Sequence, residues 1–280
     1  MSNDTRRVLF CRSGGGLPGL DIHAGIWLAL DAAGIQSTHC SGTSAGAIVS
    51  ACDATGRSPH HFIPIIKNMR DSDVRRERFM WRLRALWIDW FLSSEPVLEQ
   101  LNKLLPSTPR DLKKTLQVWA TRENDGIAYC LDQPFKSLSK QVFASMAIAG
   151  VFPPVTFGED DTGPDFSDGG PTNYCALTPG WQSYDEVWLL IATPNYKYQP
   201  KRQSVVSRAI MNVQVLTQRL IRSQIAEVEQ HPQASQNHFP DVYVIRPTCG
   251  QESGMLHFDH SLIGKAKAEA AAQIEMQIGH

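Results

Sequence analysis

Hydrophobic and polar positions along the chain follow two different periods. Short apolar runs such as 8–11 and 186–192 have the length of strands, whereas the apolar residues of 20–33 recur at a near-helical spacing. The same periodicities predict strands at 37–41 and 241–246, helices at 44–55, 138–149, 204–230 and 260–278, a helical region at 59–105, a hairpin at 116–131 and a loop at 151–180. Strands that alternate with helices predict an α/β fold, a three-layer sandwich with helices on both faces of a mostly parallel sheet.

A sharp turn with a serine at its centre is predicted between a strand and the helix that follows it. Residues 42–46 fit the G-x-S-x-G pattern of a nucleophile elbow, in which only small residues fit beside an exposed serine hydroxyl. An isolated match is equally typical of a plain helix start. The strand before it and the small, apolar helix after it are the setting that the elbow requires, so Ser44 is the candidate nucleophile.

A glycine-rich run at 14–19 follows the first predicted strand and precedes the helix at 20–33. Glycine lets the backbone approach a ligand closely, and the N-terminus of the next helix adds partial positive charge. Attack of a serine on an ester places negative charge on the carbonyl oxygen, which preorganised N–H groups stabilise. The run is therefore a candidate anion site.

The same glycines also fit the G-x-G-x-x-G fingerprint of dinucleotide-binding proteins. That fold needs an acidic residue about 20 positions later, at the end of the second strand, to bind the ribose hydroxyls. The second predicted strand ends at Cys40, Ser41 and Gly42, and Asp31 falls inside the preceding helix. The sequence therefore disfavours a nucleotide site.

A third motif, Asp168-Gly169-Gly170, completes a set that resembles the patatin-like phospholipases and acylhydrolases. That family has a glycine-rich loop, then a G-x-S-x-G elbow, and much later an Asp-Gly-Gly or Asp-Gly-Ala motif. Alone, this third motif would fit an ordinary turn. The segments that resemble the family, in its order, are 13–35, 42–48, 144–155 and 167–173.

The resemblance implies a two-residue centre that hydrolyses lipid acyl esters through an acyl-enzyme, without histidine, metal ion or cofactor. Ser44 would be the nucleophile and Asp168 the base that accepts its proton. The resemblance also assigns an oxyanion hole to the backbone N–H groups of Gly14, Gly15 and Gly16, and motif positions to Gly19, Gly42, Gly46, Gly169 and Gly170. A carboxylate of ordinary pKa is a poor base at neutral pH, so we expect burial on acyl-chain binding to raise the pKa of Asp168.

Two positions depart from the family pattern. Pro18 stands where the glycine loop of the family carries Arg or Lys, so a positive charge near the anion site is missing. Proline is tolerated in the first turn of a helix, so we expect the backbone of the loop to be kept and recognition of an anionic head group by it to be weakened. Ala176 stands where many relatives have Pro, which we interpret as drift in a loop.

Two other functions fit parts of the sequence. A Ser-Asp-His hydrolase would use a late histidine, His257 or His260, but that fold places several strands before its elbow and only two are predicted before Ser44. A non-catalytic lipid- or acyl-binding protein that keeps the fold is disfavoured by the intact Ser44 and Asp168, and favoured slightly by Pro18.

Composition narrows the class of protein. With 280 residues and 42% hydrophobic content, the chain can form one acylhydrolase domain over 1–280. A net charge of −1 gives no basic field for nucleic acid, and the family resemblance implies a lipid or phospholipid acyl ester as the partner. The six cysteines show no metal-ligand spacing, and no run of apolar residues suits a signal peptide or a membrane span, so we expect a cytoplasmic protein.

One segment, 75–92, combines arginines with large apolar side chains, and it lies within the helical region 59–105 that is a candidate cover over the acyl site. At helical spacing Trp87 and Trp90 fall on one arc, beside an arginine arc that includes Arg78. Such a helix suits peripheral contact with an anionic bilayer. The alternative is a helix packed on the protein's own core with a solvated arginine face.

Overall fold

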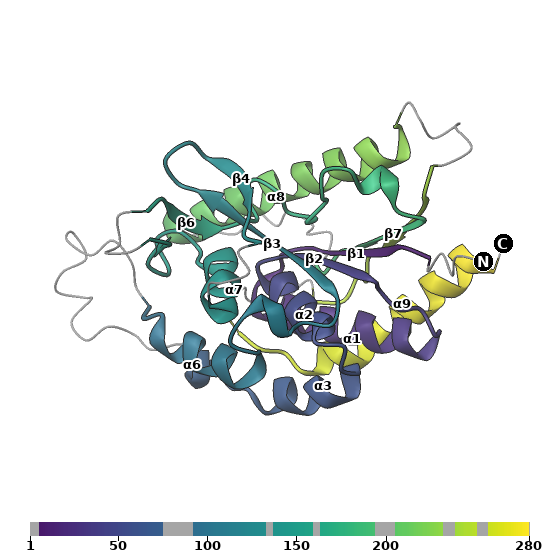
Figure 1. Cartoon of the computed structure of the whole chain (residues 1–280), viewed down its shortest axis with the longest axis horizontal. Coiled ribbons are helices and arrows are strands. Elements are labelled where there is room, and N and C mark those ends of the chain that lie inside the picture. Colours follow the sequence, from purple (N-terminus) through teal and green to yellow (C-terminus); the bar gives the residue numbers. More distant parts are fainter. Residues whose placement is uncertain are drawn as a thin grey trace.

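The computed structural model describes residues 6–74, 92–132, 137–158, 163–193, 205–231, 239–250 and 257–279 (Figure 1). At its centre is one mixed sheet, with strands in the order β5-β6-β3-β2-β1-β7-β8 and with β4 paired to β3 off this path. The strands are β1 (Val8–Arg12), β2 (His39–Thr43), β3 (Thr115–Arg122), β4 (Ile127–Cys130), β5 (Val155–Thr156), β6 (Asp165–Asp168), β7 (Glu186–Leu190) and β8 (Asp241–Ile245). The pairs β1-β2, β1-β7, β2-β3 and β7-β8 are parallel, so the predicted mostly parallel sheet is confirmed.

Helices cover both faces of this sheet, as predicted (Figure 1). Below it in Figure 1 lie α1 (Gly16–Ala32), α2 (Ala45–Ala54), α3 (Pro59–Asn68), α6 (Glu95–Leu104), α7 (Leu138–Met146) and α9 (Ser261–Ile278), and above it lies α8 (Val205–Glu229). The remaining helical pieces are α4 (Asp71–Val74), η1 (Pro109–Asp111) and η3 (Trp181–Ser183). Successive side chains of β1 point to opposite faces of the sheet and so contact both helical layers. Phe10 packs with Ile26 of α1 on one face, and Leu9 packs with Val228 of α8 on the other.

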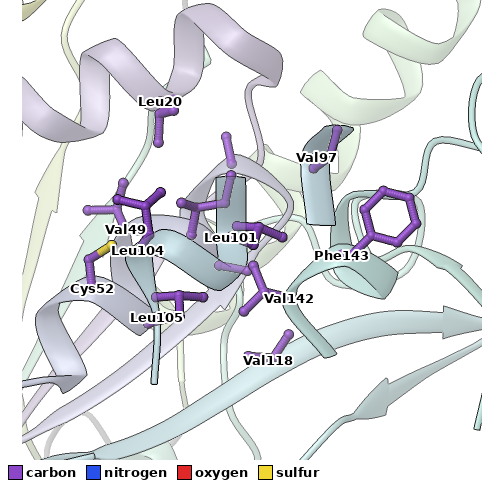
Figure 2. Packing of buried hydrophobic residues seen from close by; sticks show 14 of the residues in the cluster. Leu20, Val49, Cys52, Val97, Leu101, Leu104, Leu105, Val118, Val142 and Phe143 are labelled. Atoms are coloured by element: carbon purple, nitrogen blue, oxygen red, sulfur yellow. The ribbon is translucent and has the colours of Figure 1, made fainter. Parts of the chain in front are cut away.

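The largest group of buried hydrophobic residues lies between the sheet and helices α1, α2, α3, α6 and α7. Figure 2 shows Leu20 and Val49 from α1 and α2 packed near Leu101 and Val142 from α6 and α7. Of the described helices in the region 59–105, α3 and α6 contribute buried side chains to this core. The basic aromatic segment 75–92 is different, because 75–91 lie outside the described residues.

The predicted elements and the observed ones differ at a few ends. Helix α1 begins at Gly16, before the predicted start at residue 20, and includes Pro18 in its first turn, where proline is tolerated. Helix α7 ends at Met146, and the predicted loop 151–180 contains the strands β5 and β6. Strands of two and four residues are too short to show a hydrophobic period, which is why the sequence did not reveal them.

A buried ion cluster ties the central strand β1 to α2. The Arg12 guanidinium lies 2.7 Å from one carboxylate oxygen of Asp53, and the Lys114 ammonium lies 2.7 Å from the other. Burial raises the pKa of the Asp53 carboxyl, but these two cations outweigh it and hold the pKa below its ordinary value. Since only Ser13 separates Arg12 from the glycine-rich run, the cluster fixes the base of that loop.

Among the described helices, none has both the length and the apolar character needed to cross a membrane.

Candidate active site

Ser44 lies in the turn where β2 passes into α2. Its φ of 54° and ψ of −124° put a residue other than glycine in a sparsely populated region of backbone space. Such a conformation costs about 1–3 kcal/mol and persists only where the surroundings hold it. A strained serine between a strand and a helix is the geometry expected of a nucleophile elbow.

The two elbow glycines occupy crowded positions. Gly42 is in β2, and a Cβ atom built on it would lie 2.6 Å from the Cα atom of Ala47. A Cβ atom on Gly46 would overlap the carbonyl oxygen of Arg12 in β1. Helix α2 can therefore start this close to the sheet only because residue 46 has no side chain.

Strand β3 brings Asp168 to Ser44. On one edge of β3, both Trp119 and Ala120 pair with β4. On the other edge, Trp119 pairs with Thr43 of β2 and Ala120 pairs with Asp168 of β6. Because β4 occupies one edge in both cases, β2 and β6 follow one another along the opposite edge. β2 is parallel to β3 and β6 is antiparallel to it, so the carboxyl ends of β2 and β6 meet.

The side chains of Ser44 and Asp168 are in contact at this junction. The Asp168 carboxylate lies close enough to the Ser44 hydroxyl for that hydroxyl to lower its pKa, and it accepts a hydrogen bond from the Gly170 N–H at 2.7 Å. Burial raises the pKa of Asp168 from its ordinary 3.8 to about 6, although the Ser44 hydroxyl and the Gly170 N–H both lower it. This burial is present without an acyl chain, so the raised pKa that we expected from substrate binding is already a property of the fold.

The glycines of the Asp-Gly-Gly motif allow this approach. A Cβ atom on Gly169 would overlap the carbonyl oxygen of Trp119, so the chain can leave β6 against β3 only with glycine there. The next residue, Gly170, supplies the N–H that holds the Asp168 carboxylate.

The glycine-rich loop lies beside both side chains. The N–H of Gly14 donates to the carbonyl oxygen of Tyr174 at 3.1 Å, so this N–H already has an acceptor within the fold. Gly15 caps α1 and Gly16 begins it, and the first N–H groups of a helix have no partner within the helix. Gly19 donates to the Gly15 carbonyl at 3.1 Å and closes the first turn.

Two cavities meet at Ser44. The larger, of about 430 Å³, is lined on its catalytic side by Gly15, Ser44 and Asp168 and on its far side by Leu216 of α8. The smaller, of about 30 Å³, is apolar and is lined by Ser44 together with side chains of α1, α2, α6 and α7 and of the segments before α6 and after α7. Those side chains are Leu17, Leu20, Ile48, Leu92, Val97, Met146, Ile148 and Phe152.

The late histidines point elsewhere. The ring of His260 contacts Asp21 at 2.8 Å through Nδ1 and the Met69 carbonyl oxygen at 2.9 Å through Nε2, so both of its nitrogens are engaged. His257 contacts Asp71 at 2.7 Å through Nδ1. Neither histidine lines either cavity, so the group beside the Ser44 hydroxyl is a carboxylate.

Sequence reasoning missed residues that hold the site together. Tyr174 lines the larger cavity, accepts from the loop through its carbonyl and contacts the Thr193 hydroxyl through its own. His23 is fully buried and donates through Nε2 to the Ser13 carbonyl at 2.7 Å, and burial lowers its pKa to about 3, so it is neutral. Neither residue belongs to a motif, and no sequence signal marked them.

No cluster of three or more metal-binding side chains occurs in the part of the chain that the structure describes.

Comparison with known proteins agrees with the fold and with the order of the motifs. The sequence model of the family described as patatin-like phospholipase matches residues 10–177. VipD from Legionella pneumophila is 14% identical at a TM-score of 0.53, over 97% of this chain and 67% of VipD. ExoU from the type III secretion system of Pseudomonas aeruginosa, solved with SpcU, is 16% identical at a TM-score of 0.47, over 98% of this chain and 53% of ExoU.

The chain thus spans about half the length of ExoU. Comparison with curated proteins gives no match. The family match covers more than half of the chain and contains all three motifs, and the likeness to VipD agrees with it at the level of the fold. The chain belongs to the patatin-like phospholipase family.

Proposed function

We propose that the protein is a serine acylhydrolase that cleaves lipid acyl esters with Ser44 and Asp168. The observation that carries the proposal is the position of Ser44, in a strained turn, beside the Asp168 carboxylate on the wall of a cavity of about 430 Å³. A weak nucleophile needs an adjacent base, and this base has a pKa raised toward the working range. Family membership supplies the substrate class.

In the first half-reaction, Ser44 Oγ attacks the ester carbonyl carbon and its proton passes to the Asp168 carboxylate. The N–H groups of Gly15 and Gly16 stabilise the resulting oxyanion. As the tetrahedral intermediate collapses, the carboxylic acid of Asp168 returns the proton to the leaving alcohol. In the second half-reaction, a water molecule loses a proton to Asp168 and attacks the acyl-enzyme, and Ser44 recovers its proton as the fatty acid leaves.

The two cavities support a division of the substrate between them. The apolar lining of the smaller cavity suits the start of an acyl chain, and its volume of about 30 Å³ leaves room for only a short part of that chain. The larger cavity, which also contains Asp168 and Thr193, suits the alcohol portion. This arrangement favours esters of short acyl chains.

A chromogenic short-chain ester tests the assignment of Ser44. We expect hydrolysis by the wild-type protein and, in Ser44→Ala, at most the residual ~10³–10⁴-fold acceleration over water that an oxyanion hole and binding can give. A fluorophosphonate should label Ser44. Labelling of another residue, or full activity of Ser44→Ala, would contradict the proposal. Binding of acyl chains without hydrolysis or labelling would favour the non-catalytic acyl-binding protein instead.

A second set of variants tests the base. Asp168→Asn should lose nearly as much activity as Ser44→Ala, because the two residues act as a unit. Asp165→Asn, which changes an exposed carboxylate on the same strand, is the matched control and should keep activity. His257→Ala and His260→Ala should also keep it. A hundredfold loss in either histidine variant, with an active Asp168→Asn, would replace the dyad by a triad.

We also propose peripheral membrane contact through 75–92. Protein should sediment with vesicles of anionic lipid, and less so as salt rises, because screening acts beyond about 8–10 Å. A Trp87→Ala, Trp90→Ala double variant should lose this binding and keep hydrolysis of a soluble ester. Truncating a buried tryptophan lowers the free energy of unfolding by about 3–5 kcal/mol. A double variant that loses several kcal/mol of stability would instead assign the two tryptophans to the core.

A further inference from the structure

Ser145, near the end of α7, is a fully buried residue that touches both halves of the candidate site. Its hydroxyl oxygen accepts a hydrogen bond from the Ser44 N–H at 2.9 Å and lies 2.5 Å from the carbonyl oxygen of Trp119. Its carbonyl oxygen accepts from the Gly169 N–H at 3.2 Å. One residue therefore joins the elbow, strand β3 and the Asp-Gly-Gly motif.

The direction of these hydrogen bonds follows from the chemistry of the groups. A carbonyl oxygen only accepts, so the single proton of the Ser145 hydroxyl is donated to Trp119. A lone pair of the same oxygen is then left to face the Ser44 N–H. The orientation of the hydroxyl is thus fixed by β3, and the backbone of the elbow is held against it.

The end of α7 holds the base in a similar way. The last carbonyl groups of a helix have no partner within the helix and bind other donors. Here the N–H of Gly169 donates to Ser145 and the N–H of Asp168 donates to the Ala147 carbonyl at 2.9 Å. Nucleophile and base are therefore both anchored to the same end of one helix.

The strain at Ser44 explains why such an anchor is needed. A φ of 54° is unfavourable for serine and is kept only by contacts around it. We propose that Ser145 is a positioning residue, whose hydroxyl holds the Ser44 backbone in the strained turn so that the Ser44 side chain reaches Asp168. Ser145 lines neither described cavity, so it acts on the reaction through Ser44 and does not touch the substrate.

The effect of this residue on catalysis rests on the proposed function, and Ser145→Ala tests it. Misplacement of a reacting group by about 1 Å can reduce the rate about 10²-fold, so we expect kcat for a short-chain ester to fall about 10–100-fold. KM should change little, because no substrate contact is removed. The midpoint of the pH-rate profile should rise above that of the wild type, because the Ser44 hydroxyl, which lowers the pKa of Asp168, is no longer held beside the carboxylate.

Ser139→Ala is the matched control, since Ser139 is a buried serine near the start of the same helix, at the end away from the site. It should leave kcat, KM and the pH midpoint unchanged. If Ser145→Ala does not fold, Ser145→Cys takes its place, because a thiol, slightly larger than a hydroxyl, leaves no cavity and is a weaker donor and acceptor. A folded variant at Ser145 with the kcat and pH midpoint of Ser139→Ala would overturn the proposal.

Hydrogen exchange separates this proposal from the proposed function. If the wild-type protein neither hydrolyses esters nor reacts with a fluorophosphonate, the acylhydrolase assignment fails. Hydrogen exchange of the Ser44 amide tests the contact with Ser145 even in that case. The exchange should be at least about tenfold faster in Ser145→Ala than in Ser139→Ala, because the Ser44 N–H loses its acceptor. Equal exchange in the two variants would overturn the role of Ser145.

Discussion

Replacing Asp168 with asparagine is expected to stabilise the protein at neutral pH while removing its activity. Folding raises the pKa of this carboxyl from 3.8 to about 6, chiefly because of burial. Each unit corresponds to about 1.4 kcal/mol, so the full shift would be about 3 kcal/mol. Because the carboxyl lines the cavity and stays partly exposed, we expect about 1–2 kcal/mol.

The sign of the effect depends on pH. The native state binds the Asp168 proton more tightly than the unfolded state does, so the cost to the wild type is complete above pH 6. As pH falls below 6 the cost decreases, and it disappears only below the ordinary pKa of 3.8, where both states are protonated. An asparagine side chain would carry no charge at any pH, and its amide oxygen can still accept from the Gly170 N–H. The advantage of Asp168→Asn should therefore be complete at pH 8 and much smaller at pH 4.5, and it should vanish below the ordinary pKa of 3.8.

Urea unfolding at pH 8 and at pH 4.5, followed by circular dichroism, measures this difference. Asp165→Asn serves as the control, because exposed substitutions usually change the free energy of unfolding by no more than about 0.5 kcal/mol. Equal differences between wild type and Asp168→Asn at both pH values would refute the reasoning, and so would a variant less stable at pH 8.

The same carboxyl should control the pH dependence of the rate. Only the ionised form accepts the Ser44 proton, so kcat/KM should rise with pH and level off above a midpoint of about 6. A midpoint near 4 would mean that the fold does not perturb Asp168. A midpoint near 7 that vanishes in His260→Ala would mean that a histidine is the base.

Three further predictions concern the scaffold. Gly46→Ala should prevent folding or inactivate the protein, measured by thermal melting and ester hydrolysis, because its methyl group would overlap a carbonyl oxygen of β1. Asp53→Ala should destabilise the fold by about 3–5 kcal/mol in urea, because it leaves the buried Arg12 without its carboxylate. His260→Ala should lower the melting temperature at pH 6 more than at pH 8. Burial lowers the pKa of His260, but the contacts with Asp21 and the Met69 carbonyl outweigh burial, so the net pKa is raised. The stabilisation by His260 is therefore present below the ordinary pKa of 6.5 and is lost as pH rises through the raised value.

The sequence predicted those features that short, local patterns carry. The order of strands and helices followed from periodicity, and Ser44, Gly42 and Gly46 followed from the small residues that a sharp turn needs. The sequence also indicated Asp168 through its motif, but not the strand β6 on which it lies, because four residues show no period.

Contacts between distant segments were beyond such reasoning. Nothing local shows that the Gly14 N–H is taken by the Tyr174 carbonyl or that the Ser145 hydroxyl faces Ser44. The segment containing Ser145 resembles the family, but that likeness assigns no role to this residue. Roles of this kind depend on which backbone groups meet after the sheet has formed.

The arrangement of β2 and β6 along one edge of β3 makes hydrolysis a reporter of strand register. Side chains alternate between the faces of a sheet, so a slip of β6 by one residue against β3 would turn the Asp168 side chain away from Ser44. The same slip would turn Phe166 of β6 out of the core, so the melting temperature would fall as well. A one-residue insertion in the loop before β6 could be absorbed as a bulge in that loop, which would keep both activity and melting temperature, or as a shift of the ladder, which would lower both.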